Sequence, residues 1–158
     1  MIRPFRPADA EAVGAMAQEL MAAMRALGDR NEGRFDAAAF RRDGFGERPA
    51  FAGLIAEARG EAQGYLLYSE IYDTDLAQRV LFVVDLYVRP AARGSGLGRA
   101  LMEEAARLCR SAGGGALLWA VLHQNAAAMA FYEALGARHV DDVRFMFLPL
   151  GAAGATAI

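Results

Sequence analysis

The sequence predicts a mixed α/β (α+β) fold, with a central sheet of about seven strands flanked by about four helices. Its 158 residues are 55% hydrophobic and 23% charged, which suits one domain with a sizeable core. Three strand-like segments follow one another between residues 51 and 88. A glycine-rich turn, an amphipathic helix and another apolar strand come next. The spacing of apolar residues thus changes from that of strands to that of a helix and back, which indicates strands and helices packed in layers.

The first half of the chain is expected to begin with a short strand and two helices. Ile2–Phe5 alternates as an edge strand does, and Asp9 is placed to cap a helix over residues 10–27. Asp36 is placed to cap a second, short helix through residue 42. Residues 51–58 and 63–72 then form a hairpin, and residues 80–88 are apolar on both faces, as expected of a central strand. One carboxylate, Asp85, interrupts that strand.

The second half continues with alternating helices and strands. The pattern predicts helices over residues 97–111 and 125–135 and strands over residues 116–122, 138–140 and 143–148. We expect residues 1–150 to form a single domain and residues 151–158 to be a frayed C-terminal tail.

The composition excludes several function classes. A net charge of −2 disfavours a general nucleic-acid binder. One cysteine, Cys109, excludes an internal disulfide, and with two distant histidines it predicts no metal site. Every basic side chain is Arg, which excludes a Walker-type loop and a lysine Schiff base. We see neither an export signal nor a membrane span and expect a cytoplasmic protein without a membrane partner.

The segment with the clearest chemistry is Arg93–Arg99, here called the glycine loop. It joins the apolar strand to the next helix, and its sequence is Arg-Gly-Ser-Gly-Leu-Gly-Arg. Glycines at such a junction let backbone N–H groups converge on an anion at a helix N-terminus. Arg89 adds a positive charge, and residues 86–102 contain no acid. The loop therefore predicts a phosphate or pyrophosphate site, unless the glycines only form a tight turn with solvated arginines.

The chain resembles the GNAT superfamily of acetyl-CoA-dependent N-acetyltransferases. The family's phosphate signature is Arg or Gln, two residues, Gly, one residue, then Gly or Ala, and it is matched by Arg93, Gly96 and Gly98. The segments Val84–Pro90 and Phe131–Gly136 and the order of elements also resemble the family. The resemblance implies the GNAT fold, with a mixed, mostly antiparallel sheet, and acetyl-CoA as co-substrate without a metal.

The resemblance also assigns roles to residues around the cofactor. It implies that the backbone of Leu86, Tyr87 and Val88 pairs with the pantetheine arm. The amides of the glycine loop are expected to hold the pyrophosphate, from Gly94, Ser95, Gly96, Leu97, Gly98 and Arg99. Asn125 matches a residue that contacts the cofactor arm, and it is also placed to cap a helix.

Three further side chains are candidates for the reaction. Tyr132 matches the family tyrosine near the thioester sulfur and is a candidate general acid, or else a core aromatic beside Phe131. Asp85 is either a satisfied polar group in the core or a cleft residue that binds the ammonium or acts as base through water. Trp119 either packs in the core or lines the acceptor site. The buried thiol of Cys109 is not needed.

The resemblance is closest to the diamine and polyamine acetyltransferases. These carry Glu-Asp where this chain has Val84-Asp85, which removes the usual base. We expect acetyl transfer to a primary amine of a small molecule: a diamine or polyamine, an amino acid or an amine drug. The alternatives are a non-catalytic acyl-CoA sensor and a protein N-terminal acetyltransferase. Exposed closing strands would permit a homodimer.

Overall fold

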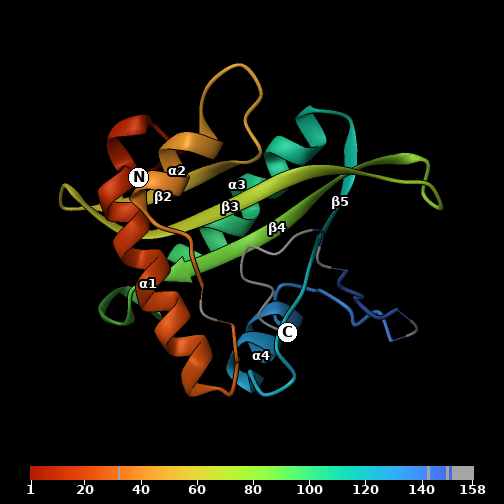
Figure 1. Ribbon diagram of the computed structural model, residues 1–158. Helices are drawn as coiled ribbons and strands as arrows, with labels where there is room; N and C mark the ends of the chain where they lie inside the picture. Colours follow the sequence, from red (N-terminus) through yellow and green to blue (C-terminus); the bar gives the residue numbers. More distant parts are fainter. Residues whose placement is uncertain (32, 142, 149, 151–158) are drawn as a thin grey trace. The chain divides into compact units, whose positions relative to one another are not determined.

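A computed structural model describes residues 1–31, 33–141, 143–148 and 150 (Figure 1). The expected tail, residues 151–158, lies outside the described residues. The chain divides into two compact units, residues 1–20 with 34–120, and residues 21–33 with those from 121 onward. The elements in order are β1 (Ile2–Pro4), α1 (Ala10–Ala26), α2 (Ala37–Gly44), β2 (Ala52–Ala58), β3 (Glu61–Asp73), β4 (Gln78–Val88), α3 (Leu97–Ser111), β5 (Gly114–Trp119) and α4 (Ala126–Glu133).

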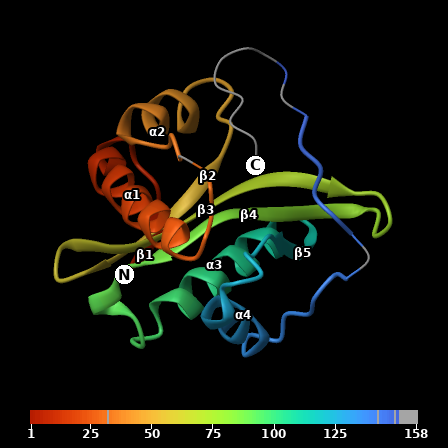
Figure 2. The same cartoon turned by 60° about the horizontal axis from the view of Figure 1, so that its bottom comes forward.

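The first unit contains a five-stranded sheet in the order β1-β2-β3-β4-β5. Strands β1 to β4 pair antiparallel, and β5 pairs parallel with β4 after the crossover through α3. The mixed, mostly antiparallel sheet is therefore confirmed. In Figure 2, the first part of α1 and all of α2 lie over one face, and α3 lies over the other. The segment before α3 follows the end of β4, a strand with a neighbour on each side.

The face beneath α1 and α2 holds an apolar core. Val13 and Met16 of α1 are buried with Phe40 of α2, against Ile55 and Tyr65 of the sheet. Their spacing on α1 is that of one helix face, which explains why this stripe becomes helical and buried. The aromatic rings of α2 and the sheet contact edge to face, as between Phe5 and Phe40, whose centroids are 5.1 Å apart.

The opposite face is covered by α3. Leu54 and Leu66 are register partners that alternate with Ile55 and Tyr65, so they point to the other side of the sheet. The residues that α3 buries are Leu101, Met102, Ala105 and Cys109. The Cys109 thiol donates to the Ala116 carbonyl oxygen at 3.3 Å, which agrees with its expected place as a small buried residue.

The caps agree in part with the expectations from sequence. Asp36 accepts from the Ala39 amide at 2.8 Å and begins α2 as predicted. Asp9 does not cap α1: its carboxylate accepts from the Arg6 amide and pairs with Arg3 of β1 at 2.8 Å. A short 3₁₀ turn that ends at Asp9 precedes the helix. The guanidinium of Arg3, six residues earlier, and the Arg6 amide bind this carboxylate in place of the helix amides.

Among the described residues, α4 is the only α-helix that lies wholly within the second unit. The strands expected over residues 138–140 and 143–148 are wrong: none of the described residues there is in a strand. Phe145 is 77% exposed. An alternating pattern forms a strand only where a neighbouring edge supplies hydrogen bonds, and the pattern carries no information about that neighbour. The sheet consequently has five strands instead of about seven.

Gly53 of β2 has a packing role that a stability measurement can check. A Cβ there would lie 2.5 Å from the Leu66 carbonyl oxygen and would also meet the Phe5 ring. We expect Gly53→Ala to lower the free energy of unfolding by about 1–3 kcal/mol, since backbone must move. Guanidinium unfolding measures this change. Gly115→Ala is the control, because the three atoms nearest its new methyl all belong to the flexible side chain of Gln78; equal effects would contradict the packing argument.

Candidate functional site

Strand β4 changes its pairing on both sides at the same place. The consecutive β3 residues Leu67 and Tyr68 pair with Asp85 and Val83 of β4, so Val84 between them has no register partner in β3. On the other side, the parallel pairs with β5 end at Val83↔Trp119. This bulge re-aims the strand. Beyond it, the described part of β5 no longer covers β4 from Val84 to Val88, and such a backbone edge can pair with an extended ligand.

The glycine loop has a backbone shaped for a group at the start of α3. Gly94 and Gly96 have φ values of 76° and 86°, in the left-handed region, and Gly96 caps α3. Open space surrounds both Cα atoms on the side where a Cβ would project. The first amides of α3, beginning at Leu97, have no carbonyl within the helix to bind. This cluster of N–H groups at a helix N-terminus fits a phosphate group.

The arginines of this region are partly neutralised. Arg93 turns back, and its Nε donates to the Val88 carbonyl oxygen at 3.0 Å while its guanidinium lies 5.8 Å from the centre of the Tyr87 ring. Arg89 pairs with Glu19 at 3.4 Å, and Arg99 approaches Glu103 at 3.9 Å. Sequence reasoning missed Glu19, because nothing in its helical pattern indicates that it faces the end of β4.

Asp85 is half-buried, directly after the bulge. The hydroxyl of Tyr65, itself fully buried, donates to its carboxylate at 2.9 Å. Burial raises the pKa of Asp85, and the Tyr65 hydrogen bond opposes that rise only in part. The same burial, with the neighbouring carboxylate, raises the pKa of Tyr65 far above its usual value, so this tyrosine stays a donor. Among the residues that the structure describes, a tyrosine hydroxyl therefore binds this carboxylate, in place of the Arg or backbone partner expected from the sequence.

Trp119 is the last residue of β5 and is half-buried. It stands in register with Val83, where β4 and β5 stop pairing. Along β4, Trp119 thus stands opposite Val83 near the middle of the strand, Asp85 follows two residues later, and the glycine loop comes after the strand's end.

Asn125 and Tyr132 belong to the second unit and are described within it. The Asn125 side chain accepts from the Ala128 amide at 3.1 Å, so its role as a cap of α4 is confirmed. Tyr132 lies in the last turn, and its ring contacts Phe131 edge to face at 5.2 Å. Gly136, with φ 90°, follows the helix, and the Ala137 amide donates to the Tyr132 carbonyl oxygen at 3.1 Å. These contacts fix the ring and the backbone of Tyr132.

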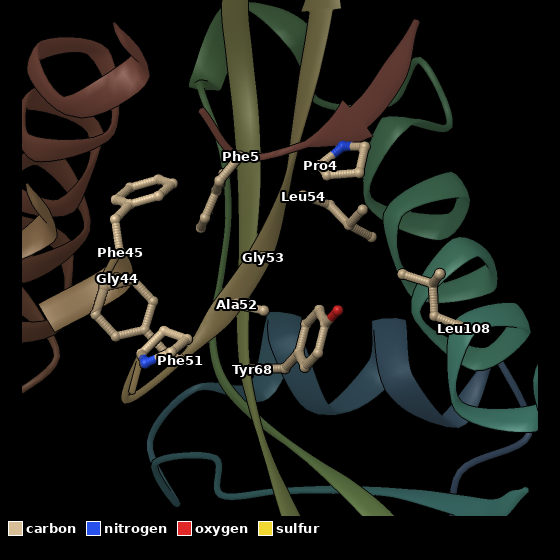
Figure 3. Close-up of a pocket in the computed structure, with 11 residues that line it drawn as sticks. Pro4, Phe5, Gly44, Phe45, Phe51, Ala52, Gly53, Leu54, Tyr68 and Leu108 are labelled. Carbon is tan, nitrogen blue, oxygen red and sulfur yellow. The ribbon is translucent and has the colours of Figure 1, made fainter. Parts of the chain in front are cut away.

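An apolar recess lies at the opposite edge of the sheet (Figure 3). It holds about 210 Å³ and is lined by residues that include Phe45, Phe51, Leu54, Tyr68 and Leu108. None of the residues predicted for the site lines it, and its lining holds no charged side chain. It therefore lacks groups that would bind a phosphate or an ammonium ion.

Two features are absent from the residues that the structure describes. No three His, Cys, Asp or Glu side chains among them lie close enough to hold a metal ion. None of their helices combines the length and the apolar character needed to cross a bilayer.

Comparison with known proteins matches residues 15–137 to the model of the acetyltransferase (GNAT) family. The chain is 39% identical over 112 residues to a thialysine N-epsilon-acetyltransferase of Sus scrofa, a match that covers 66% of this chain and 65% of that relative. It is 29% identical over 103 residues to a human spermidine/spermine N(1)-acetyltransferase-like protein, covering 61% of this chain and 15% of the relative.

A solved structure extends the likeness along the chain. The crystal structure of a mutant Bacillus halodurans protein matches with a TM-score of 0.76 and 26% sequence identity, covering 95% of this chain and 99% of that one. The structural similarity therefore covers more of this chain than the sequence alignment with the pig relative does. In that alignment, the chain spans 65% of the relative's length.

Proposed function

The chain belongs to the acetyltransferase (GNAT) family, and from that membership we propose that it transfers an acetyl group from acetyl-CoA to a primary amine of a small molecule. The observation that carries this proposal is the joint geometry of β4 and the glycine loop. A strand edge freed by a bulge is followed, after a short 3₁₀ turn over Pro90–Ala92, by left-handed glycines at a helix N-terminus. An extended arm that ends in a diphosphate has the shape and charge for both parts.

The cofactor's place follows from these two parts. The backbone of β4 at Leu86, Tyr87 and Val88 would pair with the pantetheine arm as an added strand does. Amides of Gly94, Ser95, Gly96, Leu97, Gly98 and Arg99 would hold the pyrophosphate, with the helix dipole favouring its negative charge. Asn125, besides capping α4, is proposed to contact the arm.

The reaction asks the chain for a base, an oxyanion donor and an acid. Bound acetyl-CoA supplies the acetyl group as a thioester. Asp85 accepts a proton from the incoming ammonium, directly or through water, so that the neutral amine attacks. A backbone N–H near Leu86, beside the bulge, donates to the oxygen that becomes negative. Tyr132 donates a proton to the departing sulfur.

The acceptor is proposed to be a small molecule with an aliphatic primary amine. The relatives named above are a thialysine N-epsilon-acetyltransferase and a spermidine/spermine N(1)-acetyltransferase-like protein, and an ammonium group suits a site with Asp85. Trp119, at the end of β5, is proposed to bound this site. Because Val84 stands where the polyamine branch has Glu, the chain has one carboxylate at this place, and we assign to it both binding and proton removal.

Release of free CoA thiol from acetyl-CoA, measured with polyamines, amino acids and aminoglycosides, tests the proposal. Amine-dependent release supports it and identifies the substrate class. Tight binding of acetyl-CoA without release for any amine would favour a sensor or a protein acceptor. Because the chain contains no lysine, acetyl groups cannot accumulate on lysine side chains of the protein itself, which simplifies the mass-spectrometric assignment of the product.

Arg93→Glu tests the phosphate site separately. The change removes the bond to the Val88 carbonyl and places a negative charge beside the proposed diphosphate. We expect acetyl-CoA to bind at least about tenfold more weakly by calorimetry, with the fold intact by circular dichroism. Arg110→Glu, an exposed charge reversal in the last turn of α3, is the control. Unchanged affinity for the Arg93 variant would contradict the assignment.

A single functional domain over residues 1–150 belongs to the same proposal. The cytoplasmic location and the homodimer stay predictions from the sequence. Sedimentation of the purified chain measures the second.

A further inference from the structure

Glu19 of α1 reaches the end of β4 from a position 68 residues earlier in the chain. Its carboxylate accepts a hydrogen bond from the Tyr87 hydroxyl at 2.8 Å and lies 3.4 Å from the Arg89 guanidinium. One side chain of the first helix thus holds Tyr87, near the end of the strand proposed to pair with the pantetheine arm, and Arg89, the residue that follows the strand.

These contacts continue into the glycine loop. The Tyr87 ring lies beneath the guanidinium of Arg93, and Arg93 also holds the carbonyl oxygen of Val88. Glu19 thus binds Tyr87 and Arg89, the residues on either side of Val88. Arg93, the first residue of the glycine loop, binds the carbonyl oxygen of Val88 itself. The junction between strand and loop is fixed from both sides.

No carboxylate near Tyr87 in the sequence is placed to replace Glu19, since Asp85 already accepts a hydrogen bond from Tyr65. Residues 86–102 contain no carboxylate. Tyr87 is 5% exposed, so water gives its hydroxyl little compensation if the acceptor is lost. The Nε of Arg89 is already buried without a partner among the described residues. Loss of Glu19 would leave a second part of the same guanidinium without its carboxylate, and we expect both side chains to move.

We infer that Glu19 is a positioning residue for acetyl-CoA binding, which holds the end of β4 and the glycine loop in the geometry that receives the pantetheine arm and diphosphate. The inference rests on the proposed function. It adds a residue from α1 to a site otherwise built from β4 and the loop before α3.

The sign of one substitution separates positioning from simple electrostatics. Removing a negative charge near an anionic cofactor would, by itself, strengthen binding. Loss of positioning weakens it. We expect Glu19→Gln and Tyr87→Phe each to weaken acetyl-CoA binding about tenfold, and Glu19→Ala to weaken it further.

Calorimetry with acetyl-CoA measures the affinities, and steady-state kinetics locates the change. The KM for acetyl-CoA should rise, whereas a general loss of folding would also alter the melting temperature and the KM for the amine. Glu11→Gln is the matched control, the same charge change on the same helix at an exposed pair with Arg41. Tyr87→Phe keeps the ring and tests the network if the Glu19 variants fold poorly.

The outcomes are distinct. Wild-type binding with equal or tighter binding by the Glu19 variants would overturn the positioning role and leave the proposed function standing. Absence of acetyl-CoA binding by the wild-type protein would overturn the proposed function and this inference together. Weaker binding in the Glu19 and Tyr87 variants alone supports the inference.

Discussion

Asp85→Asn is expected to slow acetyl transfer about hundredfold and, at the same time, to raise the melting temperature at neutral pH. The two effects have one physical origin. Burial makes the ionised carboxylate costly, as the raised pKa of Asp85 records. An amide keeps the shape and still accepts from the Tyr65 hydroxyl, but it carries no charge that must be desolvated.

The direction of the stability change follows from how the free energy of unfolding depends on pH. With a raised pKa in the fold, Asp85 keeps its proton at pH values where the unfolded chain has lost it. The native state then binds more protons, so the contribution of Asp85 to stability falls as the pH rises from the ordinary carboxyl range through the raised pKa. The stability difference between Asp85→Asn and wild type should grow across that window and then stay constant.

Melting temperatures across the acidic and neutral range, with turnover of the best amine, measure both effects. Asp75→Asn, an exposed change in the turn between β3 and β4, is the control and should change neither. Wild-type turnover by Asp85→Asn would eliminate this carboxylate as base. A lower melting temperature would mean that the carboxylate stabilises the fold, contrary to the direction of its pKa.

The site could be predicted in its local parts and not in its long-range ones. The glycine loop follows from adjacent residues, since left-handed glycines before a helix need no partner from elsewhere. The cap by Asn125 is equally local. The Tyr65–Asp85 bond depends on the register of two strands. A bulge at Val84, inside an apolar run interrupted only by Asp85, has no signature that distinguishes it from a regular strand.

The contacts of Glu19 and the absence of the closing strands could not be predicted from the sequence, for related reasons. A helical period identifies the buried stripe of α1, but Glu19 lies beside that stripe, and its partners Tyr87 and Arg89 are known only once β4 is placed. Residues 143–148 have the composition of a strand, and composition does not supply an edge to pair with. In each instance the missing information concerns which distant segment lies alongside.

Tyr132→Phe is expected to reduce CoA thiol release about hundredfold while leaving acetyl-CoA binding and the fold unchanged. Phenylalanine keeps the ring that contacts Phe131 at 5.2 Å, so the packing of the last turn of α4 is retained. Only the hydroxyl, the proposed source of the proton for the departing sulfur, is lost.

The pH profile distinguishes an acid from a packing residue. If the Tyr132 hydroxyl supplies the proton, the wild-type rate should fall at high pH as that hydroxyl ionises, and the variant's residual rate should lack this limb. Tyr72→Phe, at an exposed tyrosine of β3, controls for the loss of a hydroxyl. Full turnover by Tyr132→Phe at every pH would assign Tyr132 to the core of the second unit and require another donor or an unassisted thiolate departure. A hundredfold loss with unchanged calorimetry would instead place the hydroxyl at the reacting sulfur, because binding and packing would both have been shown to survive without it.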